Sequence, residues 1–82
     1  MNIHIEFCIQ WNYDPEFDRV SNIIHNVEPK AVVKGNDKPP RTGAFEITYN
    51  DKLLFSKFET NRFPKDNEII EFVELIRRDL NR

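Results

Sequence analysis

A single change in hydrophobic period within the first third of the chain limits the possible folds more than any other feature. Apolar and polar residues alternate over 3–9, a pattern typical of a strand with one apolar face. Over 14–27 the apolar residues recur at helical spacing, and Asp14-Pro15 predicts the helix start with Asp14 as N-cap. Residues 31–34 then predict a short strand. A right-handed crossover makes these two strands parallel.

The alternation of the first strand assigns its side chains to two faces. One set is expected to point into the core, and the other is expected to lie on a polar face, with Cys8 half-buried at the strand end. The core set is Ile3, Ile5, Phe7 and Ile9, and the polar set is His4, Glu6 and Cys8.

The second half of the chain predicts a hairpin. Residues 44–49 alternate again, residues 52–57 are the expected partner strand, and Asn50-Asp51 supply a tight turn. The preceding residues 35–43, with two adjacent prolines and no large apolar side chain, predict a loop. His4, Glu6, Glu46, Thr48 and Ser56 are expected on an open, solvated face of the sheet.

A connector and a second long helix complete the chain. Residues 58–64 contain two phenylalanines that we expect to pack under a helix, and residues 65–81 place a broad apolar stripe at helical spacing. The stripe comprises Ile69, Ile70, Phe72, Val73, Ile76 and Leu80. The order is therefore β-α-β-β-β-α in one domain, 1–82. Because the strands alternate, both helices are expected on one face of a mixed four-stranded sheet, giving a two-layer α/β fold.

Composition excludes several classes of protein. The 82 residues are 32% charged, yet the net charge is only -2, so the basic patch of a nucleic-acid-binding protein is absent. The single cysteine cannot form an internal disulfide. No apolar run approaches the roughly 18 residues of a membrane span, and the first residues lack a signal-peptide pattern. We therefore expect no membrane association and a cytoplasmic location.

Three segments carry a resemblance to a known family. They are FCIQWNY (7–13), RTGAFEITYN (41–50) and KLLFSKFETNRFP (52–64), and together they extend over nearly the whole chain. The pattern resembles selenoprotein W and its Rdx relatives, and the second half is similar to the animal migration-and-invasion enhancer branch of that family. The resemblance implies a thioredoxin-like fold that lacks the middle helix, with strand order 2-1-3-4.

The resemblance also implies site residues and partners. Cys8 matches the first redox cysteine of the family, and Trp11 occupies the position of the second cysteine or selenocysteine. Thr42 and Gly43 lie where a thioredoxin-like fold brings a loop close to that pair. Relatives are linked to glutathione and to 14-3-3 adaptor proteins, so both are expected partners.

Trp11 is the main departure from the family pattern. A tryptophan cannot resolve a mixed disulfide, so an intramolecular dithiol cycle is excluded for this sequence. Tryptophan and selenocysteine codons differ by one base, so the gene sequence would show whether Trp11 represents selenocysteine. The predicted helix begins six residues after Cys8, and the nearby charges in the sequence are acidic. Lys38 or Arg41 in the loop could approach the thiol across the fold.

Two functions remain open. The first is a redox protein in which Cys8 acts with an external thiol such as glutathione as co-substrate. The second is a redox-inactive binding module that presents the Cys8–Tyr13 turn and the 35–43 loop, with Trp11 and Tyr13 as anchors. No metal site is expected, because His4, Glu6 and Cys8 lie too far apart along one strand to converge.

Overall fold

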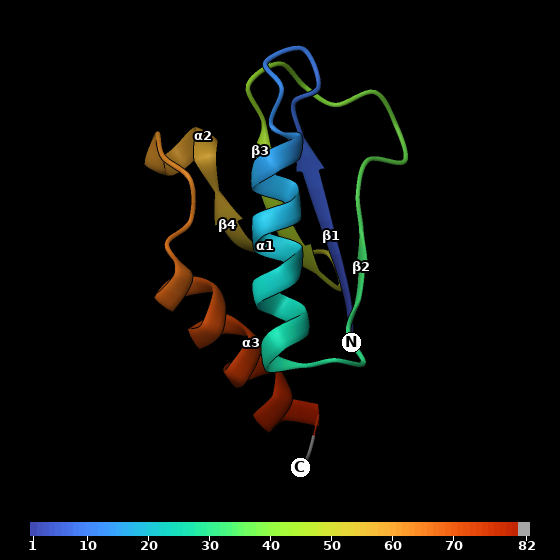
Figure 1. Ribbon diagram of the computed structural model, residues 1–82, viewed down its shortest axis with the longest axis vertical. Helices are drawn as coiled ribbons and strands as arrows, with labels where there is room; N and C mark the ends of the chain where they lie inside the picture. The colour runs from blue at the N-terminus through green and yellow to red at the C-terminus, as the bar shows by residue number, and fades with distance from the viewer. Residues whose placement is uncertain (81–82) are drawn as a thin grey trace.

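The four strands form one mixed sheet in the order β2-β1-β3-β4. The computed structural model describes residues 1–80 (Figure 1). The strands are β1 (Asn2–Phe7), β2 (Val32–Lys34), β3 (Phe45–Tyr49) and β4 (Lys52–Ser56). β1 pairs with β2 in parallel and with β3 antiparallel, and β3 pairs antiparallel with β4. The predicted strand order and the β-α-β-β-β-α sequence of elements are confirmed.

Two long helices cover one face of this sheet (Figure 1). They are α1 (Asp14–Val27) and α3 (Asp66–Leu80), and a four-residue helix, α2 (Lys57–Thr60), lies between β4 and α3. The core is built from side chains of the sheet and of both helices: Ile3, Ile5, Phe45, Ile47, Phe55, Val20, Ile24, Ile69 and Val73. Each fully buried aliphatic side chain contributes about 1.5–3 kcal/mol. No helix within residues 1–80 is long and apolar enough to cross a membrane.

The first strand ends two residues earlier than its alternation predicts. β1 pairs with β3 only as far as Phe7, and the chain then turns, passing through a left-handed conformation at Asn12 (φ 57°). Cys8 is therefore buried, with 1% of its surface exposed, whereas Ile9 is 60% exposed. The predicted faces of both residues are wrong, because alternation assigns sides only while the backbone stays extended.

Helix α1 has the predicted bounds but a different N-terminus. The N-cap is Tyr13, without a side-chain cap, and Asp14 is the first helical residue. The Tyr13 carbonyl accepts hydrogen bonds from the N–H groups of Glu16 (3.1 Å) and Phe17 (3.0 Å). Acidic Asp14 and Glu16 remain in the first turn, where they interact favourably with the helix dipole.

The hairpin turn forms as predicted, and the connector differs from its prediction. Asn50 and Asp51 both have positive φ, as a tight hairpin turn requires. In the connector, Ser56 caps α2 by accepting a hydrogen bond from the Glu59 N–H (3.2 Å). Phe63 packs against the core, but Phe58 is exposed, because α2 turns it toward the open face of the sheet.

Helix α3 buries a narrower stripe than its sequence predicts. Ile69, Val73 and Ile76 are buried, whereas Ile70 and Leu80 are exposed. The helix packs against α1 and the core through the middle of the stripe, and residues at its margin remain exposed. Residue 81 of the predicted helix lies outside the described residues.

Candidate functional site

The turn between β1 and α1 is held by main-chain hydrogen bonds. The Cys8 N–H donates to the Ala44 carbonyl (2.9 Å), and the Tyr13 N–H donates to the Cys8 carbonyl (3.0 Å). Within the turn, the Asn12 N–H donates to the Ile9 carbonyl (2.9 Å). The position of Cys8 is therefore fixed from both the β3 side and the α1 side.

The Cys8 thiol is closed off from solvent and faces a donor. The main-chain N–H of Trp11 donates to Sγ at 3.4 Å. A hydrogen bond donated to a sulfur stabilises negative charge on it. Because only 1% of Cys8 is exposed, a reagent can reach Sγ only if the surrounding turn moves.

Trp11 lies against Gly43, which belongs to the 35–43 loop. Gly43 has a φ of +80°, and a Cβ added to it would lie 2.8 Å from Cζ3 of Trp11. The backbone conformation therefore favours glycine, and an added Cβ would displace the indole. The Tyr13 ring lies edge-on to Trp11 at a centroid distance of 6.3 Å, and the Thr42 hydroxyl lies 3.5 Å from Oε1 of Gln10.

All five predicted site residues lie at one end of the molecule. The structure brings together Cys8, Trp11, Tyr13, Thr42 and Gly43 where the turn after β1 meets the chain before β3 (Figure 1). Trp11 is 55% exposed and Ile9 is 60% exposed, so this end also presents an apolar surface. The roles of these residues stay predictions.

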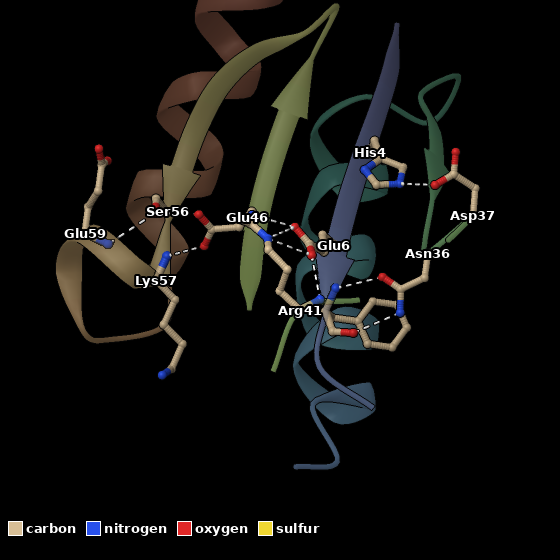
Figure 2. Close-up of polar contacts among 10 residues, drawn as sticks. His4, Glu6, Asn36, Asp37, Arg41, Glu46, Ser56, Lys57 and Glu59 are labelled. Carbon is tan, nitrogen blue, oxygen red and sulfur yellow. Dashed lines mark hydrogen bonds and ion pairs between the residues drawn. The ribbon is translucent and has the colours of Figure 1, made fainter. Parts of the chain in front are cut away.

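Arg41 does not serve the thiol but binds Glu6 on β1 (Figure 2). Its Nη2 lies 2.7 Å from Oε1, its Nε lies 3.1 Å from Oε2, and its main-chain N–H donates to Oε2 at 2.8 Å. These hydrogen bonds lower the pKa of Glu6 against the effect of partial burial. The acidic group nearest Cys8 on β1 is thus already paired with a cation.

The start of the same loop is fastened to β1 by Asn36, which the sequence analysis did not identify. Its side-chain amide accepts from the Phe7 N–H (2.9 Å) and donates to the Phe7 carbonyl (2.9 Å), as a neighbouring strand would (Figure 2). His4 Nε2, shielded from solvent, lies 3.6 Å from the Asp37 carboxylate. The only sequence signal for the role of Asn36 is that it directly follows Gly35, where the predicted loop begins.

The open face of the sheet carries a groove of about 660 Å³, and two residues that are predicted to be solvated there, Glu46 and Ser56, are buried. The loop forms one wall, and α2 with Phe58 contributes to the other. On its floor Glu46 is buried, with 7% exposed, and accepts from the Ser56 hydroxyl (2.5 Å) and the Lys57 N–H (2.8 Å) (Figure 2). Within residues 1–80 no three His, Cys, Asp or Glu side chains are grouped to hold a metal ion.

The sheet order, the two helices on one face and the turn between β1 and α1 define a thioredoxin-like fold of the selenoprotein W type. Residues 2–75 match the model of the Rdx family, and the chain belongs to that family. The predicted family resemblance is confirmed.

Solved structures agree with this assignment of the fold. A selenoprotein W-related protein from Vibrio cholerae aligns with a TM-score of 0.76 and 22% identity, over 92% of this chain and 94% of its own. A protein from Bordetella parapertussis aligns with a TM-score of 0.76 and 21% identity, over 89% and 92% of the two chains. At this level of sequence identity, the structural similarity establishes the fold alone.

The predicted similarity to the animal branch is also found, as a distant one. Migration and invasion enhancer 1 from Bos taurus is 27% identical over 73 residues, and the Mus musculus protein is 26% identical over the same length. In both cases the aligned region is 89% of this chain and 62% of the relative. The chain thus spans about three fifths of the length of these relatives.

Proposed function

We propose that the protein is a thiol redox protein in which Cys8 reacts and external glutathione replaces the missing second thiol. The observation that supports this proposal is the hydrogen bond from the Trp11 N–H to Sγ, at the turn where the resemblance to selenoprotein W implies a redox cysteine. The thiolate is the reacting form of a cysteine, and a main-chain N–H beside the sulfur is a group that can donate to it. A reducing, glutathione-containing compartment suits this chemistry, so we also propose a cytoplasmic location.

The reaction with a peroxide balances with two molecules of glutathione. The Cys8 thiolate attacks one oxygen of hydrogen peroxide and the O–O bond breaks, and with one proton this gives a sulfenic acid and water. A first glutathione attacks the sulfur, releases a second water and forms a mixed disulfide. A second glutathione attacks the glutathione sulfur, so that glutathione disulfide leaves and the Cys8 thiol is restored. The two electrons come from the two glutathione thiols.

Burial of the thiol has a kinetic consequence. Both the peroxide and glutathione must reach Sγ, which is closed off in the folded protein. Reaction therefore requires an opening of the turn formed by residues 9–12, and the rate is proportional to the population of the open form.

The experiment compares native and unfolded protein. Each is treated with peroxide and then with a small excess of glutathione, and the intact mass is followed over time. The proposal expects the native protein to gain one glutathione, which a larger excess of glutathione removes. A native protein that gains none, while the protein in urea reacts, would have an inert thiol, and the proposal would be wrong.

A second function is favoured by the exposed apolar surface at the same end. We propose as the alternative that the Cys8–Tyr13 turn and the 35–43 loop bind a protein partner without redox chemistry. Ile9 and Trp11 are both more than half exposed there, and large aromatic residues dominate binding energy at interfaces. By family resemblance, a 14-3-3 adaptor protein is the first partner to test.

Three variants separate the two functions in a direct binding assay with the adaptor. Trp11→Ala is expected to weaken binding by at least tenfold, about 1.4 kcal/mol or more, as for a central aromatic contact. Cys8→Ser is expected to leave binding unchanged. Leu75→Ala, which removes an exposed apolar side chain from α3, is the matched control. Equal binding by Trp11→Ala and wild type would exclude this surface.

A further inference from the structure

The turn formed by residues 41–44 is attached at two points, to Glu6 on β1 and to Cys8, which directly follows that strand. At one end, the Glu6 carboxylate holds both the main-chain N–H and the guanidinium of Arg41. At the other end, the Ala44 carbonyl accepts from the Cys8 N–H (2.9 Å), and the Ala44 N–H donates to the Arg41 carbonyl (3.2 Å). Because Glu6 and Cys8 are two residues apart on the same chain, the turn is closed into a small ring against the end of β1.

Gly43 lies inside this ring and supports the Trp11 side chain. The ring atoms of Trp11 approach it so closely that an added Cβ would displace the indole. The backbone of the same residue, Trp11, donates the hydrogen bond to Sγ of Cys8. A change in the position of the 41–44 turn is therefore expected to move Trp11, and with it the N–H that lies beside the sulfur.

We propose that Arg41 and Glu6 are a positioning pair for Cys8, which holds the 41–44 turn and Trp11 closed over the thiol. The pair acts through the turn and does not touch the sulfur. The proposal rests on the proposed function of Cys8 for its biological meaning, but its geometry can be tested separately.

The surroundings of Arg41 explain why it stays at this place. Glu46 of β3 is directly opposite Glu6 of β1, and two adjacent carboxylates would repel each other without a cation. Arg41 interacts with both of them, and its guanidinium also lies over the Phe58 ring at 4.9 Å. Besides Arg41, the other titratable group that acts electrostatically on Glu6 is His4, which is also on β1. Arg41 is thus held from β1, β3 and α2 together.

The test uses Trp11 as a probe, since it is the only tryptophan in the sequence. Glu6→Gln and Arg41→Gln are compared with wild type in two assays: quenching of tryptophan fluorescence by acrylamide, and the rate of alkylation of the native thiol by iodoacetamide. An ion pair of this exposure predicts an increase of about two- to fivefold in the alkylation rate, together with stronger quenching. The control is Glu74→Gln, which removes a carboxylate from the Arg77 pair on α3 (3.1 Å). It is expected to change neither measurement.

A lower global stability could also raise the alkylation rate. Ile47→Val, a mild core variant, is therefore measured in the same assay to distinguish that effect from a local one. If alkylation in Glu6→Gln rises no more than in a core variant of equal stability, the positioning role is wrong. Unchanged quenching in both Glu6→Gln and Arg41→Gln also overturns it. Neither result depends on glutathione. A native protein that fails to react with glutathione would refute the proposed redox function, while stronger quenching in these variants would still support the positioning pair.

Discussion

Replacing Gly43 by alanine tests the contact on which the geometry of the site depends. A residue with a Cβ costs about 1–2 kcal/mol in a left-handed conformation, and Gly43 has a φ of +80°. The added Cβ would lie 2.8 Å from Cζ3 of Trp11, about 0.7 Å closer than the shortest favourable carbon separation of roughly 3.5 Å. The indole must therefore move. Coupled neighbours typically interact by at least about 0.5 kcal/mol, so we expect a total loss of about 1.5–3 kcal/mol.

The assay is urea denaturation followed by far-UV circular dichroism, which does not depend on the tryptophan signal. Gly43→Ala is measured alone and in the Trp11→Ala background. Without the indole only the backbone cost remains, so the double mutant should be more stable than the sum of the single effects predicts, by about 0.5–1 kcal/mol. Gly43→Asn separates the backbone cost from the cost of the contact with the indole. Asparagine tolerates a left-handed backbone better than alanine but carries the same Cβ, so mainly the contact cost should remain.

Two results would refute this reasoning. If Gly43→Ala is as stable as wild type, the turn does not need a left-handed residue. If the two single effects add without coupling, the indole does not rest on Gly43. In the second case the proposed link from Arg41 through the turn to Trp11 would also lose its central contact.

Three further predictions concern the rest of the fold. Asn36→Ala should cost about 1–3 kcal/mol in urea denaturation, because it leaves the N–H and C=O of Phe7 without the side-chain amide; a neutral result would contradict the role of Asn36 as a strand substitute. The pKa of Glu68 is lowered from 4.5 to about 2, first by its hydrogen bond with Arg62, so its contribution to stability is complete above pH 4.5 and is lost as the pH falls toward 2. In Arg62→Gln, an NMR titration should find the pKa of Glu68 closer to 4.5, and an unchanged value would exclude Arg62 as the cause. Ile47→Ala should cost about 2–5 kcal/mol, since Ile47 is fully buried in the core, and thermal unfolding would check this value.

The regular elements could be predicted from the sequence because each has a period that its packing requires. The alternation before Phe7 and the helical spacing after Asp14 agree with β1 and α1, and α1 spans the predicted 14–27, with Asp14 as its first helical residue and not its N-cap. The predictions of which side chains are buried were wrong where the alternation or the helical spacing ends. Ile9 was expected in the core by continued alternation, and it is exposed because the strand ends at Phe7. At the margin of α3, Ile70 is exposed for a related reason, since spacing alone does not say how wide a stripe the neighbouring elements cover.

The candidate site was predicted as a set of residues but not as an arrangement. The sequence pointed to Cys8, Trp11 and Gly43 through the family pattern, and the structure brings them together. It did not predict the pairing of Arg41 with Glu6. Those residues are 35 positions apart, and their pairing depends on the path of the loop. Local patterns carry no information about such a path.

The sequence by itself determined the layers of the fold, the family, and one chemical exclusion. An indole at position 11 has no sulfur or selenium, so a dithiol cycle within this chain is excluded whatever the fold. Only the tertiary structure decided how Cys8 is presented. Its burial, the N–H directed at its sulfur and the attachment of the 41–44 turn all arise where the end of β1 meets the start of β3 and the start of α1. The Trp11 N–H is only three residues from Cys8, but the turn that directs it at the sulfur lies against Gly43 and Ala44, which are distant in the chain and which only folding brings to this place.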